Sequence, residues 1–176
     1  MSDTARHKLL MLSRYFPPFQ TAASHRAVRL GRYLPEFGWD CVVGTTLETC
    51  WPTIDLTLND QIPPEMPVYR FPCCDPQTHL NIWFRRLRGS LAFPKKVLGK
   101  SAYYSLWNIS SPDSAIWRIG SIYHHVAEIV RKEAPDAIWI TGMPFSWFTM
   151  IHRLKREFHL PVILDLRDPW TQNPRM

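Results

Sequence analysis

The sequence has no hydrophobic run long enough to cross a bilayer. A membrane-spanning helix needs about 20 consecutive apolar residues, and polar or charged residues interrupt every apolar run of this chain before that length. The residues from Met1 to Lys8 lead directly into a short strand-like run, without the apolar core and small-residue cleavage site of a secretory signal. We therefore expect neither a membrane span nor a secretion signal.

Cysteine is scarce, and its four copies do not have the spacing of a metal site. Cys41 falls within a strand pattern and is predicted to be a buried thiol. The adjacent residues Cys73 and Cys74 are predicted to be two reduced thiols and not a disulfide. This use of cysteine favours a cytoplasmic protein over a secreted one.

Glycine is also scarce, with seven among 176 residues and none before Gly31. The loop after the first expected strand therefore lacks the G-x-G-x-x-G fingerprint of dinucleotide-binding proteins. The chain also lacks a P-loop, an H-E-x-x-H zinc motif and a G-x-S-x-G nucleophile motif. His124 and His125 are adjacent within an expected helix and do not share a face, so they are predicted to be surface or partly buried histidines. We expect no metal and no cofactor that this chain holds by itself.

Acidic residues are absent from the segment 79–111, which holds six Lys or Arg residues. The rest of the chain holds fifteen basic and fifteen acidic residues, so the whole net charge of +6 comes from this segment. Apolar residues are interleaved with the basic ones, and such a stretch fits the surface of an anionic membrane. The predicted membrane-contact residues are Trp83, Phe84, Arg85, Arg86, Arg88, Lys95 and Lys96. A solvated basic insertion is the alternative, and nucleic acid is not an expected partner because no nucleic-acid-binding motif accompanies the segment.

Strand and helix patterns alternate along the chain. Strand-like apolar runs are expected at 8–13, 40–46, 68–71, 136–141 and 161–166. Amphipathic helices are expected at about 22–37, from the stretch SPDSAIW to Pro135, and at about 146–158. Strands that are apolar on both faces and alternate with helices predict a Rossmann-like, doubly wound, mostly parallel α/β sheet. We expect a single domain over residues 1–176, with the basic segment as an insertion.

The residues at the ends of the expected helices agree with these boundaries. Thr21 is predicted to cap the first helix, and Gly38 sits where a left-handed glycine ends one. Ser111, Asp113 or Ser114 is predicted to cap the second helix. The stretch 47–67 is expected to be irregular.

Doubly wound sheets bind ligands outside the carboxyl ends of their strands. Arg14 and Tyr15 directly follow the first expected strand and are candidates for lining such a site. His25 and Arg26 lie at the start of the first helix, where backbone N–H groups and the helix dipole favour an anion. Arg26 could hold a phosphate or an acidic sugar; the alternative is a solvated arginine on an amphipathic face.

Four stretches of the chain resemble, in the same order, the N-terminal domain of family 4 glycosyltransferases. They are LSRYFPPFQTAASHRAVRLGRYLPEFGWDCVVGTT, SPDSAIW, PDAIWITGMPFS and PVILDLRDPWTQNP. The resemblance extends over nearly the entire chain and is least clear in the basic segment. The resemblance implies the GT-B fold, in which an N-terminal domain binds the acceptor and a C-terminal domain binds the nucleotide-sugar donor. It also implies that these 176 residues need that C-terminal domain to transfer a sugar to a glycan or lipid-linked acceptor, and that a bare cleft face could self-associate.

Two places depart from the pattern of that family. Many members have a Gly-Gly pair in the first loop that approaches the donor phosphates, whereas this chain has no glycine from Gln20 to Ser24. Many members also have a histidine after the fourth strand, and this chain has Gly142-Met143-Pro144 there. The fourth strand is therefore not followed by a catalytic base.

The loop that follows the last expected strand, from Asp165 to Trp170, also lies at the expected ligand edge and holds two acids and an arginine. Asp165, Arg167 and Asp168 could bind the hydroxyls of an acceptor, and the alternative is an Arg-Asp ion pair that fixes the loop. A general base must reach the acceptor hydroxyl, and Asp168 is the acid predicted to do so.

The resemblance predicts a cytoplasmic enzyme of cell-envelope polysaccharide synthesis, peripheral on the inner face of the membrane. A non-catalytic Rossmann-like module that binds a ligand or a partner is the alternative function.

Overall fold

The computed structural model describes residues 6–47, 54–72 and 113–167. Within them, five strands form one sheet in the order β3-β2-β1-β4-β5. Every neighbouring pair of these strands is parallel. The strands are β1 (His7–Leu12), β2 (Trp39–Thr46), β3 (Val68–Phe71), β4 (Ala137–Thr141) and β5 (Val162–Asp165). The Rossmann-like α/β fold expected from the sequence is confirmed.

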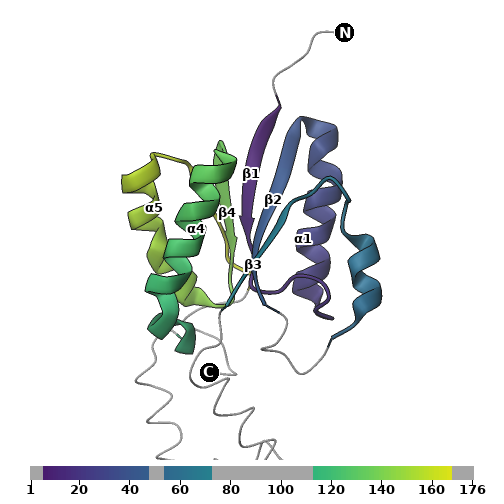
Figure 1. The fold of residues 1–176 in the computed structure, drawn as a ribbon, viewed down its shortest axis with the longest axis horizontal. Helices are drawn as coiled ribbons and strands as arrows, with labels where there is room; N and C mark the ends of the chain where they lie inside the picture. The colour runs from purple at the N-terminus through teal and green to yellow at the C-terminus, as the bar shows by residue number, and fades with distance from the viewer. Residues whose placement is uncertain (1–5, 48–53, 73–112, 168–176) are drawn as a thin grey trace, which may run out of the picture.

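Helices cover both faces of the sheet (Figure 1). Helix α1 (Ala22–Tyr33) lies on one side, and helices α4 (Ile119–Glu133) and α5 (Ile151–Phe158) lie on the other. Four short 3-10 helices complete the described elements: η1 (Leu34–Phe37), η3 (Leu56–Gln61), η4 (Ser114–Arg118) and η5 (Phe145–Met150). The stretch that was expected to be irregular therefore contains one regular turn, η3.

Helix α1 begins at the predicted residue and ends earlier than predicted. The side chain of Thr21 accepts a hydrogen bond from the backbone N–H of Ser24, which satisfies one of the unpaired donors of the first turn. The α-helix was expected to run to Phe37, but it changes to the 3-10 helix η1 at Leu34. The reason is Pro35, which has no N–H to continue the α-helical ladder. Gly38 then ends the segment in the left-handed conformation, with a φ of 81°.

Asp113 is the cap at the start of the next helical segment. Its Oδ1 accepts a hydrogen bond from the N–H of Ala115 at 3.1 Å, and this cap opens η4 before α4 begins. The same carboxylate accepts hydrogen bonds from the N–H of Ser146 at 3.0 Å and from its hydroxyl at 2.6 Å. One side chain therefore joins the starts of two helical segments that are far apart in the sequence.

The two faces of the sheet hold separate hydrophobic cores. On one face, Ala27 and Val28 of α1 pack with Met11, Val43 and Trp139 of the strands. The core on the opposite face is larger and includes residues of α4, η5 and α5. Its fully buried residues include Leu10, Ile122, Val126, Ile138, Ile140, Trp147 and Leu154. The predicted inner residues of α4 agree with this core, since Tyr123, Val126 and Val130 are buried and Ile119 packs against them.

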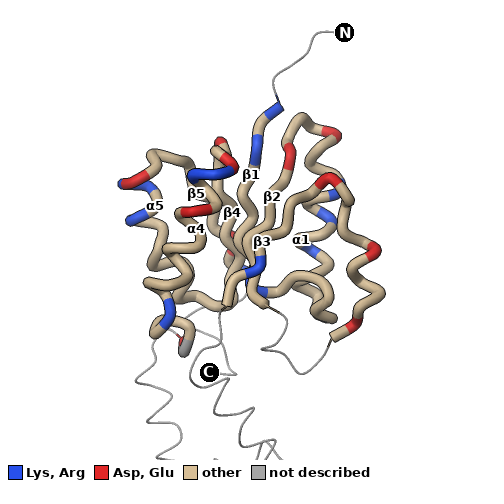
Figure 2. The backbone as a smooth tube through the Cα atoms, in the orientation of Figure 1, with Lys and Arg blue, Asp and Glu red and all other residues tan. Residues whose placement is uncertain are grey.

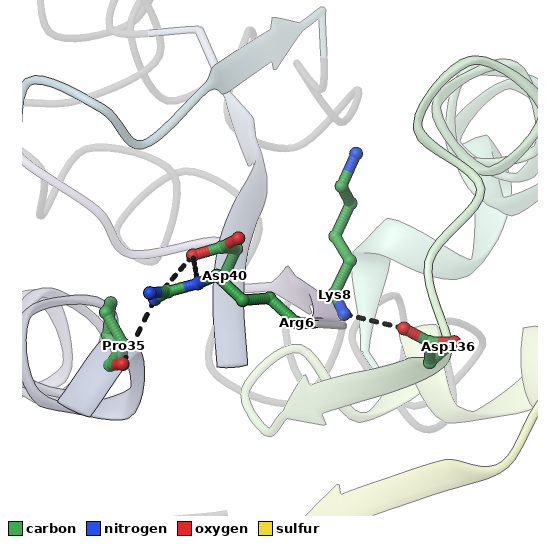
Figure 3. Close-up of polar contacts among 5 residues, drawn as sticks. All are labelled: Arg6, Lys8, Pro35, Asp40 and Asp136. Carbon is green, nitrogen blue, oxygen red and sulfur yellow. Dashed lines mark hydrogen bonds and ion pairs between the residues drawn. The ribbon is translucent and has the colours of Figure 1, made fainter. Parts of the chain in front are cut away.

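Polar contacts hold the amino-terminal edge of the sheet (Figure 3). The Nε of Arg6 donates to Oδ1 of Asp40 at 2.9 Å, and its Nη2 donates to the carbonyl of Pro35 at 3.0 Å. The backbone N–H of Lys8 donates to Oδ2 of Asp136 at 2.7 Å. These contacts tie the beginnings of β1, β2 and β4 together.

The order of the strands reverses at the centre of the sheet. The chain goes from β1 outward through β2 to β3, and then returns to place β4 on the other side of β1. This reversal is the switch point where doubly wound sheets leave a crevice beyond the carboxyl ends of the strands. Any ligand of this fold is therefore expected near the ends of β1 and β4.

The sheet is less evenly covered than the sequence predicts. The sequence predicts strands that are apolar on both faces in a sheet covered by helices, and β1 and β4 agree, with buried residues along most of β1 and all of β4. Strand β5 differs, because Ile163 and Leu164 are exposed. In the part of the chain that the structure describes, no helix is long and apolar enough to cross a membrane.

Candidate functional site

An ion pair between a helix and a strand lies at the carboxyl edge of the sheet. Nη2 of Arg26, in the first turns of α1, lies 2.9 Å from Oδ1 of Asp165, the last residue of β5. The other oxygen of this carboxylate, Oδ2, accepts a hydrogen bond from the hydroxyl of Thr141 at the end of β4, at 3.0 Å. The structure thus brings together two of the predicted site residues, and it adds Thr141, which sequence reasoning did not single out.

The two charged side chains differ in burial, which suits them to different roles. The Asp165 side chain is 10% exposed, whereas the Arg26 side chain is 52% exposed. Both carboxylate oxygens of Asp165 are engaged by protein groups, so this acid is suited to positioning its neighbours and not to removing a proton from a ligand. Arg26 is held at the edge of the sheet with half of its side chain open to solvent, where it can donate hydrogen bonds to an anion or a hydroxyl.

The loop after β4 is fixed by its neighbours and presents no acid or base. Nε of Arg167 donates to the carbonyl of Gly142 at 2.9 Å, and the N–H of Gly142 donates to the carbonyl of Asp165 at 3.0 Å. A Cβ at Gly142 would lie 3.1 Å from a ring carbon of Phe145 and 3.2 Å from the ring of Phe148. Close packing therefore explains why the residue here is small, and Arg167 acts on the backbone of this loop.

The loop after β1 is held to the end of β2. The carbonyl of Arg14 accepts hydrogen bonds from the hydroxyls of Thr45 and Thr46, both at 3.3 Å. The hydroxyl of Ser13 donates to the carbonyl of Tyr15 at 2.7 Å. Arg14 and Tyr15 are half-buried and lie directly after β1, and their role in lining a site stays a prediction. The two threonines were not predicted, and their only sequence signal is a pair of hydroxyls at the end of the second strand.

His25 lies in a surface groove along the outer side of α1. The groove has a volume of about 650 Å³ and is lined by Ala22, His25, Arg26, Arg29, Leu30, Tyr33, Leu34 and Phe37. His25 is half-buried, and Arg26 and Arg29 are exposed. None of the lining residues is acidic, so the groove is an electropositive surface next to the candidate site.

The carboxylates with displaced pKa values lie elsewhere in the described part of the chain. The Tyr69 hydroxyl and the Lys8 ammonium lower the pKa of Glu133. The Tyr123 hydroxyl and the guanidinium of Arg131 lower the pKa of Glu157. These contacts link α4 with β1, β3 and α5, and they are structural. Among the described residues, no cluster of His, Cys, Asp and Glu side chains could hold a metal ion.

Several predicted site residues fall outside the described ranges. The proposed base Asp168 is the first residue after the last described range. All of the predicted membrane-contact residues are also outside: Trp83, Phe84, Arg85, Arg86, Arg88, Lys95 and Lys96. Their roles stay predictions.

Comparisons with known proteins do not assign a family. A scan against protein-family models matches none of them, and a search of the curated proteins finds no significant match. The sequence motifs and the geometry of the carboxyl edge are the remaining indications of function.

Proposed function

We propose that this chain is the acceptor-binding N-terminal domain of a nucleotide-sugar-dependent glycosyltransferase. The observation that supports this most is the ion pair of Arg26 and Asp165. It links the first and the last of the four stretches that resemble family 4 glycosyltransferases, and it does so at the carboxyl edge of a Rossmann-like sheet. In the proposed reaction, a sugar moves from the nucleotide donor to a glycan or lipid-linked acceptor.

Each site residue has a distinct role in this proposal. Arg26 donates hydrogen bonds to a phosphate or hydroxyl of the acceptor, and Asp165 positions Arg26. Arg14, Tyr15 and His25 line the acceptor side. Arg167 fixes the loop that follows β4. Asp168 is the general base that accepts the proton of the acceptor hydroxyl as the new glycosidic bond forms.

The donor is proposed to bind mainly a second, C-terminal domain. The first loop has no glycine that would let its backbone approach a donor phosphate closely, and no titratable side chain follows β4 at residues 142–144. We propose that the isolated chain is inactive, and that activity needs the partner domain. A location on the cytoplasmic face of a membrane, held by the basic segment 79–111, is part of the same proposal.

The test is a transfer assay on the protein as its gene encodes it. A panel of UDP- and GDP-sugars is offered with lipid-linked and soluble glycan acceptors, and nucleotide release is measured. Asp168→Asn should lower kcat by at least about a hundredfold, the usual contribution of a general base. Arg26→Gln should raise KM for the acceptor. Arg32→Gln is the matched control, because Arg32 is an exposed arginine in the last turn of the same helix.

Two outcomes would contradict the proposal. One is the absence of both donor hydrolysis and transfer across the whole panel. The other is an Asp168→Asn variant and an Arg26→Gln variant that are as active as the Arg32→Gln control. In the first case, the second candidate is a non-catalytic Rossmann-like module that binds a partner, which the exposed apolar residues of β5 favour.

A further inference from the structure

The two edges of the sheet differ in how well they are covered. At the β3 edge, Phe71 is buried and the ring of Tyr69 is half-buried, with the Lys132 ammonium 4.9 Å from its centre. No residue of β3 is a large exposed apolar one. At the β5 edge, Ile163 is 52% exposed and Leu164 is 45% exposed. A natural sheet edge is normally protected, so the β5 edge calls for an explanation.

The exposed residues of β5 lie on both faces of the sheet. Ile163 is in register with Trp139, which belongs to the core on the α1 side. Leu164 is in register with Ile140, which belongs to the core on the α4 and α5 side. Leu166, just beyond the strand, is 59% exposed and lines the same groove as Leu164. Strands that are apolar on both faces are typical of the interior of a parallel sheet.

Among the described residues, no strand pairs with the outer side of the β5 backbone. The carbonyls of Pro161 and Asp165 accept hydrogen bonds from the β4 side, from Ile138 and Gly142 at 2.9 and 3.0 Å. In a parallel ladder, alternate residues bond to the same neighbour, so the N–H and C=O groups of Val162 and Leu164 point away from β4. In the described part of the chain, β5 pairs with no other strand. The edge therefore offers hydrogen-bonding groups to a further strand.

The groove beside this edge is apolar with a basic rim. It has a volume of about 790 Å³ and runs between α5 and β5, lined by Phe148, Thr149, Ile151, His152, Lys155, Arg156, Leu164 and Leu166. Lys155 and Arg156 are exposed and form no ion pair with another described residue. None of the residues that line this groove is acidic. Figure 2 shows basic residues along α5 and along α1, on the two sides of the sheet.

The basic residues beside the β5 edge favour one of two possible partners, a second copy of this chain or an acidic polypeptide. A second copy could pair its own β5 with this one in antiparallel fashion, about a twofold axis perpendicular to the sheet. That arrangement would place the α5 helices of both copies on one face, with Lys155 and Arg156 near their counterparts. Like charges at close range are unfavourable. An acidic partner would instead form ion pairs with the same residues.

We infer that the free edge of β5 is an interaction surface for a partner polypeptide that adds one extended, apolar strand flanked by acidic residues. The strand pairs with the outward backbone groups of Val162 and Leu164. Its apolar side chains cover Ile163 on one face and Leu164 on the other, and its acidic residues meet Lys155 and Arg156. This mode is strand addition, in which main-chain hydrogen bonds supply affinity and side chains supply specificity.

The test uses a short fluorescent peptide with a core of valine and isoleucine between glutamates. Fluorescence anisotropy should show saturable binding. A matched peptide with lysines in place of the glutamates should bind about tenfold more weakly, the result of replacing two or three favourable charge pairs. The variant Lys155→Glu/Arg156→Glu should reverse this preference.

Two further measurements test the strand pairing itself. Leu164→Pro removes one outward N–H without removing a bond to β4, and it should weaken binding by about tenfold. Leu56→Pro is the control, because Leu56 is also exposed and lies at the first position of η3, where proline is tolerated. Methylating alternate backbone nitrogens of the peptide should abolish binding, and this measurement does not depend on how a protein variant folds.

The inference is overturned by any of several results. These are no binding of the glutamate peptide, equal binding of both peptides, or binding that survives methylation of the peptide backbone. Sedimentation velocity could give another contradicting result. If the wild-type chain forms a dimer and the Leu164→Pro variant does not, a second copy of the chain is the occupant of the edge. None of these results depends on glycosyltransferase activity.

Discussion

Arg26 and Asp165 lie far apart in the sequence, yet their side chains form an ion pair of 2.9 Å at the carboxyl edge of the sheet. The carboxylate is nearly buried and also accepts a hydrogen bond from Thr141. A single acid therefore fixes α1 and β4 relative to β5.

Asp165→Asn should lower the free energy of unfolding by about 1 to 2 kcal/mol, because it removes a nearly buried charge that has two partners. Urea denaturation measures the change. The control is Asp40→Asn, whose ion pair with Arg6 is half-exposed on both sides and should contribute less than about 1 kcal/mol. A loss at Asp165 no greater than that at Asp40 would show that the Arg26 contact is an ordinary surface pair.

Asp113→Ala should destabilise the fold by about 2 kcal/mol, because one carboxylate caps η4 and also holds the N–H and hydroxyl of Ser146. Thermal unfolding of the variant measures this effect. Asp55→Ala is the comparison, since Asp55 caps η3 through Thr57 alone. That change should cost about 1 kcal/mol or less. Equal losses would mean that the link to Ser146 adds nothing.

Gly142→Ala and Gly120→Ala should change stability in opposite directions. A Cβ at Gly142 would meet the ring of Phe145 at 3.1 Å, and this crowding should cost about 1 to 3 kcal/mol. A Cβ at Gly120 meets nothing within 4 Å, and Gly120 lies within α4. Alanine there should stabilise the helix by about 0.5 to 1 kcal/mol. Chemical denaturation of both variants provides the comparison, and a stabilising Gly142→Ala would refute the packing argument.

Stability should fall in alkaline solution because of Cys41. Burial, with the nearby charge of Asp40, raises the pKa of Cys41 to about 11. The unfolded chain would release this proton near the ordinary pKa of 9.0, so above that pH it binds fewer protons than the folded protein. The contribution of the neutral thiol is therefore present below pH 9 and is lost as the pH rises toward about 11. The difference in unfolding free energy between the wild type and Cys41→Ala should shrink over that range; a constant difference would contradict this assignment.

The basic segment should bind anionic membranes. If the residues from Trp83 to Lys96 dock on a membrane, the protein should sediment with anionic vesicles at low salt and be released at high salt. Replacing Arg85, Arg86 and Arg88 with glutamine should weaken this binding, while Arg32→Gln should not. Equal binding to neutral vesicles, or no binding to either kind, would refute the membrane role.

Local rules predicted the elements of the fold well. Thr21, Gly38 and Asp113 act within a few residues of themselves, so their capping roles could be predicted from neighbouring positions alone. The periodic apolar patterns likewise predicted each strand to within a residue or two. The change from α-helix to 3-10 helix at Leu34 was missed, although Pro35 was visible in the sequence.

Long-range contacts could not be predicted in the same way. The sequence suggested that Arg26 and Asp165 approach the same edge, but not that they pair, because the choice of partner depends on how the strands are ordered. The sequence suggested that Arg167 could form an ion pair with a neighbouring aspartate. In the structure, the Nε of Arg167 donates a hydrogen bond to the carbonyl of Gly142. The exposure of β5 was missed because an apolar strand pattern does not say how many neighbours a strand has.

The central position of β1 has a consequence for how the chain folds during synthesis. Of the described strands, β1 is synthesised first and β2 follows soon afterwards, but the other neighbour of β1, β4, begins only at Ala137. The centre of the sheet therefore cannot close until β4 has left the ribosome, and one edge of β1 stays unpaired during that time. The entropy cost of closing a loop grows only slowly with its length, so a long insertion between β3 and β4 delays this closure more than it weakens the finished sheet.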